Sequence, residues 1–442
     1  MTRWPGSAAP SSRNHQRQGT TRLTLTLTVH RGTRAIGGSC IELTTSAGER
    51  LILDAGRPLD ASRDACNLLP ETLDRSVPAT VVFSHAHMDH WGLIDELPIH
   101  WPLWAGEKAA ELMRLTAGLF GAPLTRPIST WRSRDCDIRI GAFTVTPFLT
   151  DHSAPDAYML LIEAEGRRIL YTGDFRCQGR KAALVKSMIA RPPADIDALI
   201  IEGTNLGTAK PVVTEAELER DFTALAREVP GHVFVNWSAQ NLDRTVTLFR
   251  AARRSSRPLV VDLYGADVLE RIARATSLPR PGDPRFPELK VVVTGAGKRL
   301  YARQGRSDWV DAQARKPYAT SRRRLAGQRA IIMVRDSMLG EFERGGLGFT
   351  ERDAYVFSNW KGYLDEQSIS TGWARAGAAG ARTMHLHTSG HASPADIARF
   401  AAAMSPRAIV PVHGLSWDAP GINLPPVRRI ADGEPWTISE AA

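Results

Sequence analysis

The chain has 442 residues, of which 43% are apolar, and a formal net charge of +9. That length suffices for two or three domains with buried cores, and no apolar run approaches the roughly 20 residues that cross a bilayer, so we expect no membrane partner. Residues 1–20 lack the apolar segment of a secretion signal, and we expect a disordered tail there. The four cysteines form no C-x-x-C pair, which argues against a disulfide framework and favours a cytoplasmic location.

The first half of the chain is typical of sheets whose strands end at polar residues. Leu and Val alternate with Thr over residues 23–29, as in a strand with one buried face. A helix is predicted at 106–119, and further strands at 40–45, 51–54, 80–85, 137–140, 143–148, 158–166, 167–174 and 198–202. Because several strands stop at Asp or His, these polar side chains should gather at one rim of a sheet.

A second pattern begins near Leu206, where helices and strands alternate as in a parallel α/β sheet. After Arg382 the chain returns to a strand–loop–helix–strand order. We therefore predict one domain, made of residues 21–205 and 383–442, that is interrupted by an inserted α/β domain at residues 206–382. Within the insert, residues 297–328 should form a helix and an exposed loop.

Positive charge is concentrated in the inserted segment. Residues 206–382 contain 29 Lys and Arg against 20 Asp and Glu, which accounts for the whole net charge of +9. The densest stretch runs from Lys298 to Arg335 and is interrupted by only two acids, Asp308 and Asp311. Such a surface attracts polyanions by releasing their counterions; a solvated basic face without a ligand is the alternative.

The motif H-A-H-M-D-H at residues 85–90 places three imidazoles and a carboxylate directly after an apolar strand. Nitrogen and oxygen ligands of this kind suit zinc, whose catalytic sites keep one position open for water. A polar surface loop is the alternative, but it does not explain this density of ligands. Further candidates follow other strands: His152, Asp174 and His413. Asp54 is suited to accept an N–H from a ligand histidine and to fix its tautomer.

This series of residues resembles the motif set of the metallo-β-lactamase superfamily. The resemblance implies an αβ/βα sandwich with two zinc ions, or manganese in their place, at one edge of its two sheets. It also implies two ligand sets that share one carboxylate, namely His85, His87, His152 and Asp174 for one ion, and Asp89, His90, Asp174 and His413 for the other.

Further motifs resemble the β-CASP nucleases of that superfamily, and ribonuclease J most of all. They are E-G-T-N from Glu202, where ribonuclease J usually has Asp, and H-T-S-G-H at residues 387–391. The resemblance implies that Glu202 pairs with His391 as proton donor, with Asp89 as a third catalytic residue. His387, Ser389 and Gly390 would hold a phosphate.

Two residues of the insert, Asn241 and Arg244, are expected to add phosphate contacts from a helix start. A helix-capping role for Asn241 is the alternative. Trp237, Trp309 and Trp360 are candidates for stacking on bases, with ordinary packing as the alternative for each.

The function expected from these features is a zinc-dependent ribonuclease that hydrolyses phosphodiester bonds of single-stranded RNA, as a 5′-exonuclease, an endonuclease or both. A DNA nuclease of the β-CASP group is one alternative. A glyoxalase-like hydrolase of small molecules is another, but it leaves the basic insert and the H-T-S-G-H motif unexplained. A non-catalytic RNA-binding subunit would show degenerate metal ligands, which this chain does not. The oligomeric state stays open.

Overall fold

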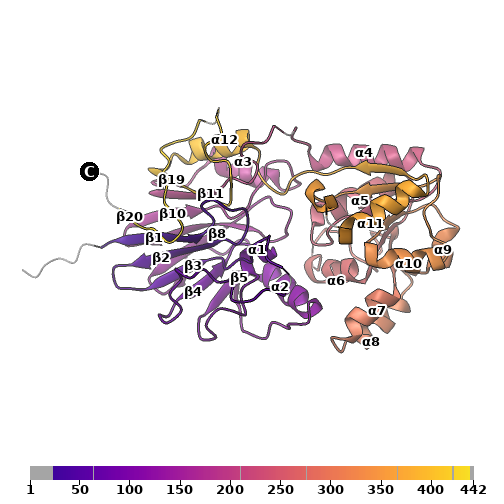
Figure 1. Cartoon of the computed structure of the whole chain (residues 1–442), viewed down its shortest axis with the longest axis horizontal. Helices are drawn as coiled ribbons and strands as arrows, with labels where there is room; N and C mark the ends of the chain where they lie inside the picture. Colours follow the sequence, from indigo (N-terminus) through magenta and orange to yellow (C-terminus); the bar gives the residue numbers. More distant parts are fainter. Residues whose placement is uncertain are drawn as a thin grey trace, which may run out of the picture.

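The computed structural model describes residues 23–438, apart from residues 63, 210, 275, 366, 421 and 422. Within these residues the strands form three sheets. Figure 1 shows two of them stacked in one half of the molecule and the third in the other half. The tail expected at residues 1–20 lies outside the described residues.

The first sheet has the order β20-β1-β2-β3-β4-β5-β6. Its pairings are antiparallel from β20 to β3 and parallel from β3 to β6. In β1, the alternation of Leu and Thr separates buried from partly exposed positions, as predicted. The strands span Leu25–Arg31 (β1), Cys40–Thr45 (β2), Arg50–Leu53 (β3), Thr80–Phe83 (β4), Leu103–Gly106 (β5), Ser129–Trp131 (β6) and Pro435–Ile438 (β20).

The second sheet has the order β19-β11-β10-β9-β8-β7 and packs face to face against the first. Leu27 and Leu43 from the first sheet share one apolar core with Val145 and Leu160 from the second. Its strands span Ile138–Ile140 (β7), Phe143–Leu149 (β8), Tyr158–Ala164 (β9), Arg167–Tyr171 (β10), Ala198–Glu202 (β11) and Ala408–Val412 (β19).

Helices cover the outer faces of both sheets. Trp91 of α1 (Met88–Trp91) and Met113 of α2 (Glu107–Leu119) pack on the first sheet. Val185 of α3 (Ala182–Ala190) and Phe400 of α12 (Pro394–Met404) pack on the second. This arrangement is the predicted αβ/βα sandwich.

The third sheet is parallel throughout, with the order β15-β14-β13-β16-β12-β17-β18. It has the alternation of strands and helices that the sequence indicated for residues 206–382, and its last strand ends at His385. The strands span Val233–Asn236 (β12), Leu259–Val261 (β13), Leu289–Val292 (β14), Ala319–Thr320 (β15), Ile331–Met333 (β16), Ala354–Phe357 (β17) and Arg382–His385 (β18). The helices α4 (Glu215–Glu228), α5 (Leu242–Arg254), α6 (Leu263–Ile272), α10 (Asp336–Arg344) and α11 (Gln367–Ala378) pack beside it.

The basic segment, residues 297–328, differs from the single helix and exposed loop that we expected. It forms three short helices, α7 (Gly295–Ala302), α8 (Ser307–Ala314) and α9 (Arg322–Ala326). Several of its cations are used inside the fold: Arg306 lies 4.6 Å from the centre of the Trp309 ring and pairs with Asp267. Pairing with acids from elsewhere in the insert therefore lowers the charge available to a ligand.

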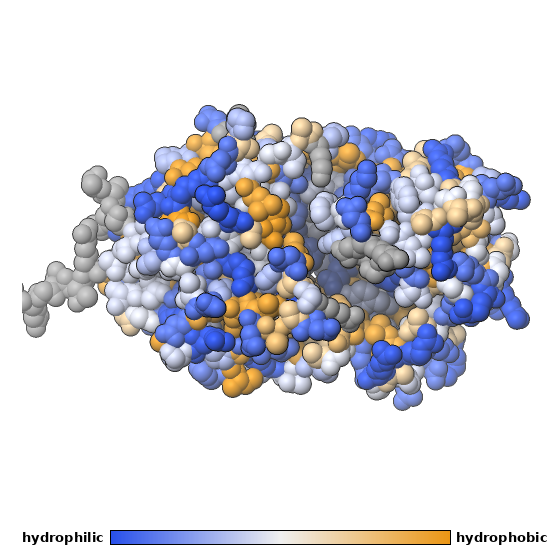
Figure 2. Space-filling model, viewed as in Figure 1, coloured by the Kyte–Doolittle hydropathy of each residue, from blue (hydrophilic) through white to orange (hydrophobic). Residues whose placement is uncertain are grey.

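The two halves of the molecule are joined by apolar packing. Helix α2 of the sandwich contacts α6 of the insert, and one hydrophobic cluster continues from α2 through α4, α5 and α6. Figure 2 shows a hollow between the two halves, beside this junction. Among the described residues, no helix combines the length and the apolar character needed to cross a bilayer.

Candidate metal centre and active site

The candidate site lies on loops that follow strands of both sandwich sheets. His85 comes just after β4, and His152 comes after β8. Asp174 follows β10, and His413 follows β19 directly. Their side chains meet although they are far apart in the sequence, because these strand ends share one edge of the sandwich.

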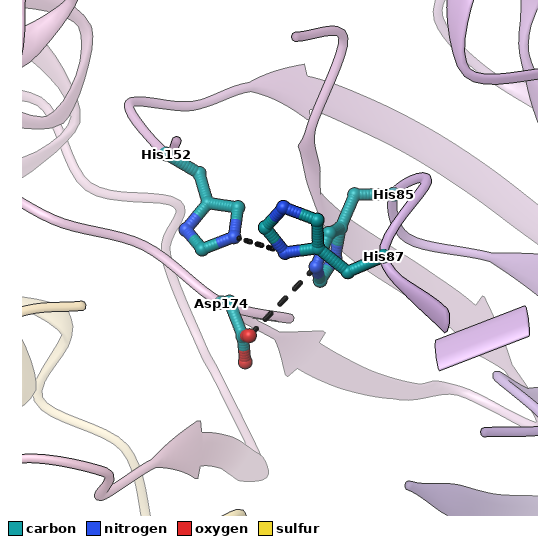
Figure 3. A group of neighbouring side chains, drawn as sticks. All are labelled: His85, His87, His152 and Asp174. Atoms are coloured by element: carbon teal, nitrogen blue, oxygen red, sulfur yellow. Dashed lines mark hydrogen bonds and ion pairs between the residues drawn. The ribbon is translucent and has the colours of Figure 1, made fainter. Parts of the chain in front are cut away.

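The structure brings together the first of the two expected ligand sets. His152 Nε2 lies 3.0 Å from His87 Nδ1, and His85 Nε2 lies 3.7 Å from Asp174 Oδ2. Figure 3 shows the three rings and the carboxylate pointing into one small space. One ligand atom from each of the four residues lies within 4.8 Å of the others.

The second set meets next to the first and shares Asp174 with it. His90 Nε2 lies 3.2 Å from Asp174 Oδ2, and His413 Nε2 lies 3.3 Å from Asp89 Oδ2. Ligand atoms of these four residues also lie within 4.8 Å of one another. All seven side chains singled out in the sequence therefore converge at one place.

Acceptors on the far side of the rings fix which nitrogen faces this space. His90 donates its Nδ1–H to Asp54 Oδ2 at 2.7 Å, as expected for Asp54. His152 donates its Nδ1–H to the carbonyl of Gly390 at 2.6 Å. A neutral imidazole that donates from one nitrogen keeps a lone pair on the other. The Nε2 atom of His152 therefore keeps a lone pair, which faces His87 Nδ1 and can bind a cation. At His90, burial lowers the pKa of the ring but the surrounding carboxylates raise it well above its ordinary range, so a metal ion would take the place of the Nε2 proton.

The donor set fits a metal ion. His85 Nε2, His90 Nε2 and Asp174 Oδ1 are buried and have no hydrogen-bond partner. Such atoms are costly to bury unless something pairs with them. Burial lowers the pKa of His85 and His152 well below its ordinary range and that of His87 to about 4, so these rings are neutral, as ligands must be. Imidazole and carboxylate ligands together are suited to zinc and to several other divalent metals.

Unusual backbone supports the site. Asp54 and His413 have positive φ values of 62° and 49°, a region that non-glycine residues seldom adopt. Gly56 passes so close to the H-A-H-M-D-H loop that a Cβ there would lie 1.7 Å from the carbonyl oxygen of Asp89. Strained and tight positions of this kind gather where the surrounding fold holds a functional site in place.

Glu202 and His391 form a hydrogen-bonded pair beside the seven residues. The fully buried Glu202 lies 2.9 Å from His391 Nδ1 through Oε2 and accepts the backbone N–H of Phe175 through Oε1. Burial alone lowers the pKa of His391, but the charges of Glu202 and Asp174 raise it to about 9. His391 is therefore cationic at neutral pH, as a proton donor needs to be. Its catalytic role stays a prediction.

The H-T-S-G-H segment lies against the same site. Ser389 Oγ accepts hydrogen bonds from Asn205 and from the backbone of His391, both at 3.1 Å, so its own O–H is free for a ligand. Burial and the neighbouring Arg244 lower the pKa of His387 to about 3, which keeps this ring neutral. Phosphate binding by these residues stays a prediction.

The structure corrects the expectation for Arg244. Its guanidinium is fully buried, pairs with Glu215 at 3.1 Å and donates to the carbonyl of Ser358 at 3.0 Å, so a phosphate has no access to it. Asn241 accepts the backbone N–H of Arg244 at 3.0 Å and so caps α5, as the alternative interpretation proposed. Both residues stabilise the insert from within.

Sequence reasoning missed a buried ion-pair network that joins the sandwich to the insert. Arg176, two residues after Asp174, pairs with Asp151 at 3.2 Å and with Asp243 of α5 at 2.6 Å. Its guanidinium also donates to the carbonyl of Ser389. The only signal in the sequence was that each charged residue adjoins a site motif, which by itself does not reveal a partner.

Comparison with known proteins agrees with this geometry. Residues 50–260 match the model of the beta-lactamase superfamily domain, and residues 380–416 match the Zn-dependent metallo-hydrolase RNA specificity domain. Ribonuclease J of Thermus thermophilus is 25% identical, covering 79% of this chain and 61% of the relative. An RNase J-like protein of Methanocaldococcus jannaschii is 31% identical, covering 40% of this chain and 42% of the relative.

The likeness extends to the three-dimensional structure. A solved protein of unknown function from Enterococcus faecalis V583 has a TM-score of 0.73 and 21% identity, covering 94% of this chain and 100% of its own, which shows the fold. The chain spans about three fifths of the length of the ribonucleases J that it matches. The chain therefore carries a beta-lactamase superfamily domain, and it resembles the ribonuclease J proteins of the β-CASP group.

Proposed function

We propose that the protein is a metal-dependent ribonuclease that hydrolyses phosphodiester bonds of single-stranded RNA. The observation that carries this proposal is one continuous site, in which two groups of four ligands share Asp174 and adjoin the Glu202–His391 pair. The match to an RNA specificity domain over residues 380–416, which contains the H-T-S-G-H motif, supports RNA as the substrate. Hydrolysis from a 5′ end, inside the strand or both would fit a protein similar to ribonuclease J.

We further propose two zinc ions per chain, with manganese as the substitute. His85, His87, His152 and Asp174 would hold one ion, and Asp89, His90, Asp174 and His413 the other. When bound, a pair of divalent ions lowers the pKa of water to about 7 and stabilises the charge that develops on a phosphoryl group.

The chain's own residues then orient the substrate and transfer a proton. Against the effect of burial, His90 and His413 hold the pKa of Asp89 below its ordinary range. Asp89 therefore stays ionised and can accept a hydrogen bond from the attacking water. His391 donates a proton to the leaving 3′-oxygen, and Glu202 stabilises its cationic form. Positioned acids of this kind contribute about 10²–10⁴-fold in rate.

The hollow between the two halves of the molecule is suited to bind an extended single strand of RNA. We propose that residues 21–205 and 383–442 form the catalytic domain and that residues 206–382 form the β-CASP domain opposite it, with strand β18 crossing this boundary as far as His385. The insert provides a positively charged wall, which attracts the phosphate backbone without regard to base sequence.

Degradation of a labelled RNA tests this function. Purified protein with zinc or manganese should degrade 5′-monophosphorylated single-stranded RNA, and His87→Ala and Asp174→Ala should abolish the reaction. Metal analysis should find about two zinc ions in the wild-type chain. Equal activity of the wild type and the two variants would refute the metal mechanism.

Parallel substrates separate the related functions. RNA and DNA strands of one sequence, each with a 5′-phosphate or a 5′-hydroxyl, distinguish a ribonuclease from a DNA nuclease and show whether the 5′ group matters. Turnover of DNA alone would refute the ribonuclease assignment while keeping the metal site.

A further inference from the structure

Two exposed aromatic residues follow β17 and do not belong to the metal centre or to the H-T-S-G-H motif. Trp360 has 56% of its surface exposed and Tyr363 has 40%. The other tryptophans considered for base contacts are committed to the fold. Trp237 is 1% exposed and donates to Thr245, while Trp309 stacks on the Tyr301 ring at 4.9 Å. Of the three candidates, Trp360 has the largest exposed fraction.

Local packing holds the Trp360 ring in place. Gly362 lies directly beneath it, since a Cβ at that position would be 2.2 Å from the indole. Tyr363, on the short helix η1 (Lys361–Asp365), meets the ring edge to face, with centroids 5.4 Å apart and planes at 88°. A large aromatic ring that is already fixed loses little conformational freedom when a flat ligand stacks on it.

Hydrogen bonds tie this loop to the segment that carries the H-T-S-G-H motif. The carbonyl of Asn359 lies 3.0 Å from His385 Nε2, and Ser358 donates its hydroxyl to the carbonyl of Leu386 at 2.6 Å. The carbonyl of Ser358 lies 3.3 Å from His387 Nδ1. The two residues that precede Trp360 are therefore bonded to the chain at residues 385–387, which leads into the H-T-S-G-H motif and to His391 beside Asp174.

The charge around the ring suits a nucleic acid. Lys361 is exposed, and among the described residues it has no ion pair. A cation next to an accessible aromatic face is the combination with which proteins hold single strands, because the ring stacks on a base and the cation contacts a phosphate.

We propose that Trp360 is a stacking platform for one nucleobase of single-stranded RNA and that Lys361 contacts an adjacent phosphate. This inference rests on the proposed ribonuclease function and adds to it a contact that holds the RNA outside the reacting centre. Stacking on an indole is tolerant of base identity. The platform should therefore position the strand without imposing a sequence preference.

An abasic scan of the holoenzyme tests the platform. Short 5′-phosphorylated RNAs, each with one base removed, are compared by kcat/KM with the complete strand. At one position, removal of the base should lower kcat/KM of the wild type by on the order of tenfold, mainly through KM. Trp360→Ala should lower kcat/KM for the complete strand by a similar factor and should show no further loss with that abasic strand.

Control variants separate stacking from a general disturbance. Trp360→Phe should keep most of the activity, because a smaller ring still stacks. Ile99→Ala, which removes another exposed apolar side chain, should change nothing. Trp360→Ala, Trp360→Phe and Ile99→Ala should all leave turnover of bis(4-nitrophenyl) phosphate unchanged, because this substrate has a phosphodiester linkage but no nucleobase that could stack. Lys361→Ala should reduce the slope of log affinity against log salt by about 0.7.

Full RNA activity in Trp360→Ala would overturn the platform. It would also be overturned if, at every abasic position, the loss of kcat/KM caused by the variant and the loss caused by the missing base were independent and multiplied. Either outcome with an active wild type would leave the ribonuclease proposal intact. A wild type that turns over no RNA would overturn both proposals.

Discussion

Replacing Asp54 with asparagine tests whether the hydrogen bonds behind His90 govern metal affinity. Asp54 is fully buried, and its carboxylate accepts four hydrogen bonds. The backbone N–H of Ser84 reaches Oδ1, while the Ser84 hydroxyl, His90 Nδ1 and the Tyr171 hydroxyl reach Oδ2, each at 2.7 Å. Asparagine has the same shape and also tolerates the positive φ at this position. The substitution therefore changes the hydrogen bonding and leaves the backbone alone.

The expected magnitude follows from counting donors. Whichever way the new side-chain amide is turned, its NH₂ group faces at least one of these four donors, so one buried donor loses its acceptor. That costs about 1–3 kcal/mol. If the orphaned donor is His90 Nδ1–H, the ring loses its fixed tautomer and orientation. Loss of such a partner typically weakens metal binding by about 10–100-fold.

Zinc affinity is measured by competition with a chelating indicator, and RNA cleavage is followed as zinc is added. Asp54→Asn should need more zinc for half-maximal activity and should approach wild-type kcat at saturation. Tyr171→Phe is the matched control, because it removes one donor to the same oxygen without orphaning another group, and its zinc affinity should stay close to that of the wild type. Unchanged zinc affinity in Asp54→Asn would refute the reasoning.

Three further predictions address other parts of the molecule. Arg244→Met should lower the free energy of unfolding by about 3–5 kcal/mol in urea titrations, because the buried carboxylate of Glu215 loses its nearest cation and, among the described residues, keeps only Thr247 and the more distant Arg176. The variant should leave the salt dependence of RNA binding unchanged, and a reduced salt slope would contradict the burial of Arg244. Burial raises the pKa of Glu42, but the hydrogen bonds from Arg50, His30 and Thr44 together with the charge of Arg50 outweigh it and lower the pKa from 4.5 to about 2. The stability that this carboxylate provides is therefore complete above about pH 4.5 and is lost as pH falls towards 2. The urea midpoint of Glu42→Gln should therefore fall less between pH 4.5 and 2 than that of the wild type. The same pH dependence in both proteins would contradict the lowered pKa of Glu42. Gly56→Ala should displace the loop at Asp89, because its Cβ would lie 1.7 Å from that carbonyl oxygen; metal analysis should find fewer ions per chain, and a full complement would show that the loop gives way without cost.

Much of the fold was readable because its signals are local. The alternation of Leu and Thr in β1 and the apolar run of β4 follow from strand geometry, in which successive side chains point to opposite faces. Ser393 caps α12 by accepting the backbone N–H of Asp396, a local interaction that is typical of Ser at a helix start. Ligands that directly follow strands could be grouped for the same reason, because strand ends meet at sheet edges.

Other features depended on partners that are distant in the sequence. The pattern around Arg244 is equally suited to a phosphate contact or an internal ion pair, and the burial of Glu215 beside it decided the matter. The cations of the basic segment were likewise expected to be available to a ligand, but in the folded chain Asp267 pairs with Arg306. Charge is a property of one residue, whereas its availability depends on what packs against it.

The sequence by itself determined the chemistry of this protein, because ligand types and their order are written in single residues and short motifs. Only the tertiary structure decided which side chains are exposed and which are paired, since exposure and pairing arise when segments hundreds of residues apart come together. Trp237 and Trp360 carry the same indole, but Trp237 is buried in the core whereas more than half of the surface of Trp360 is exposed.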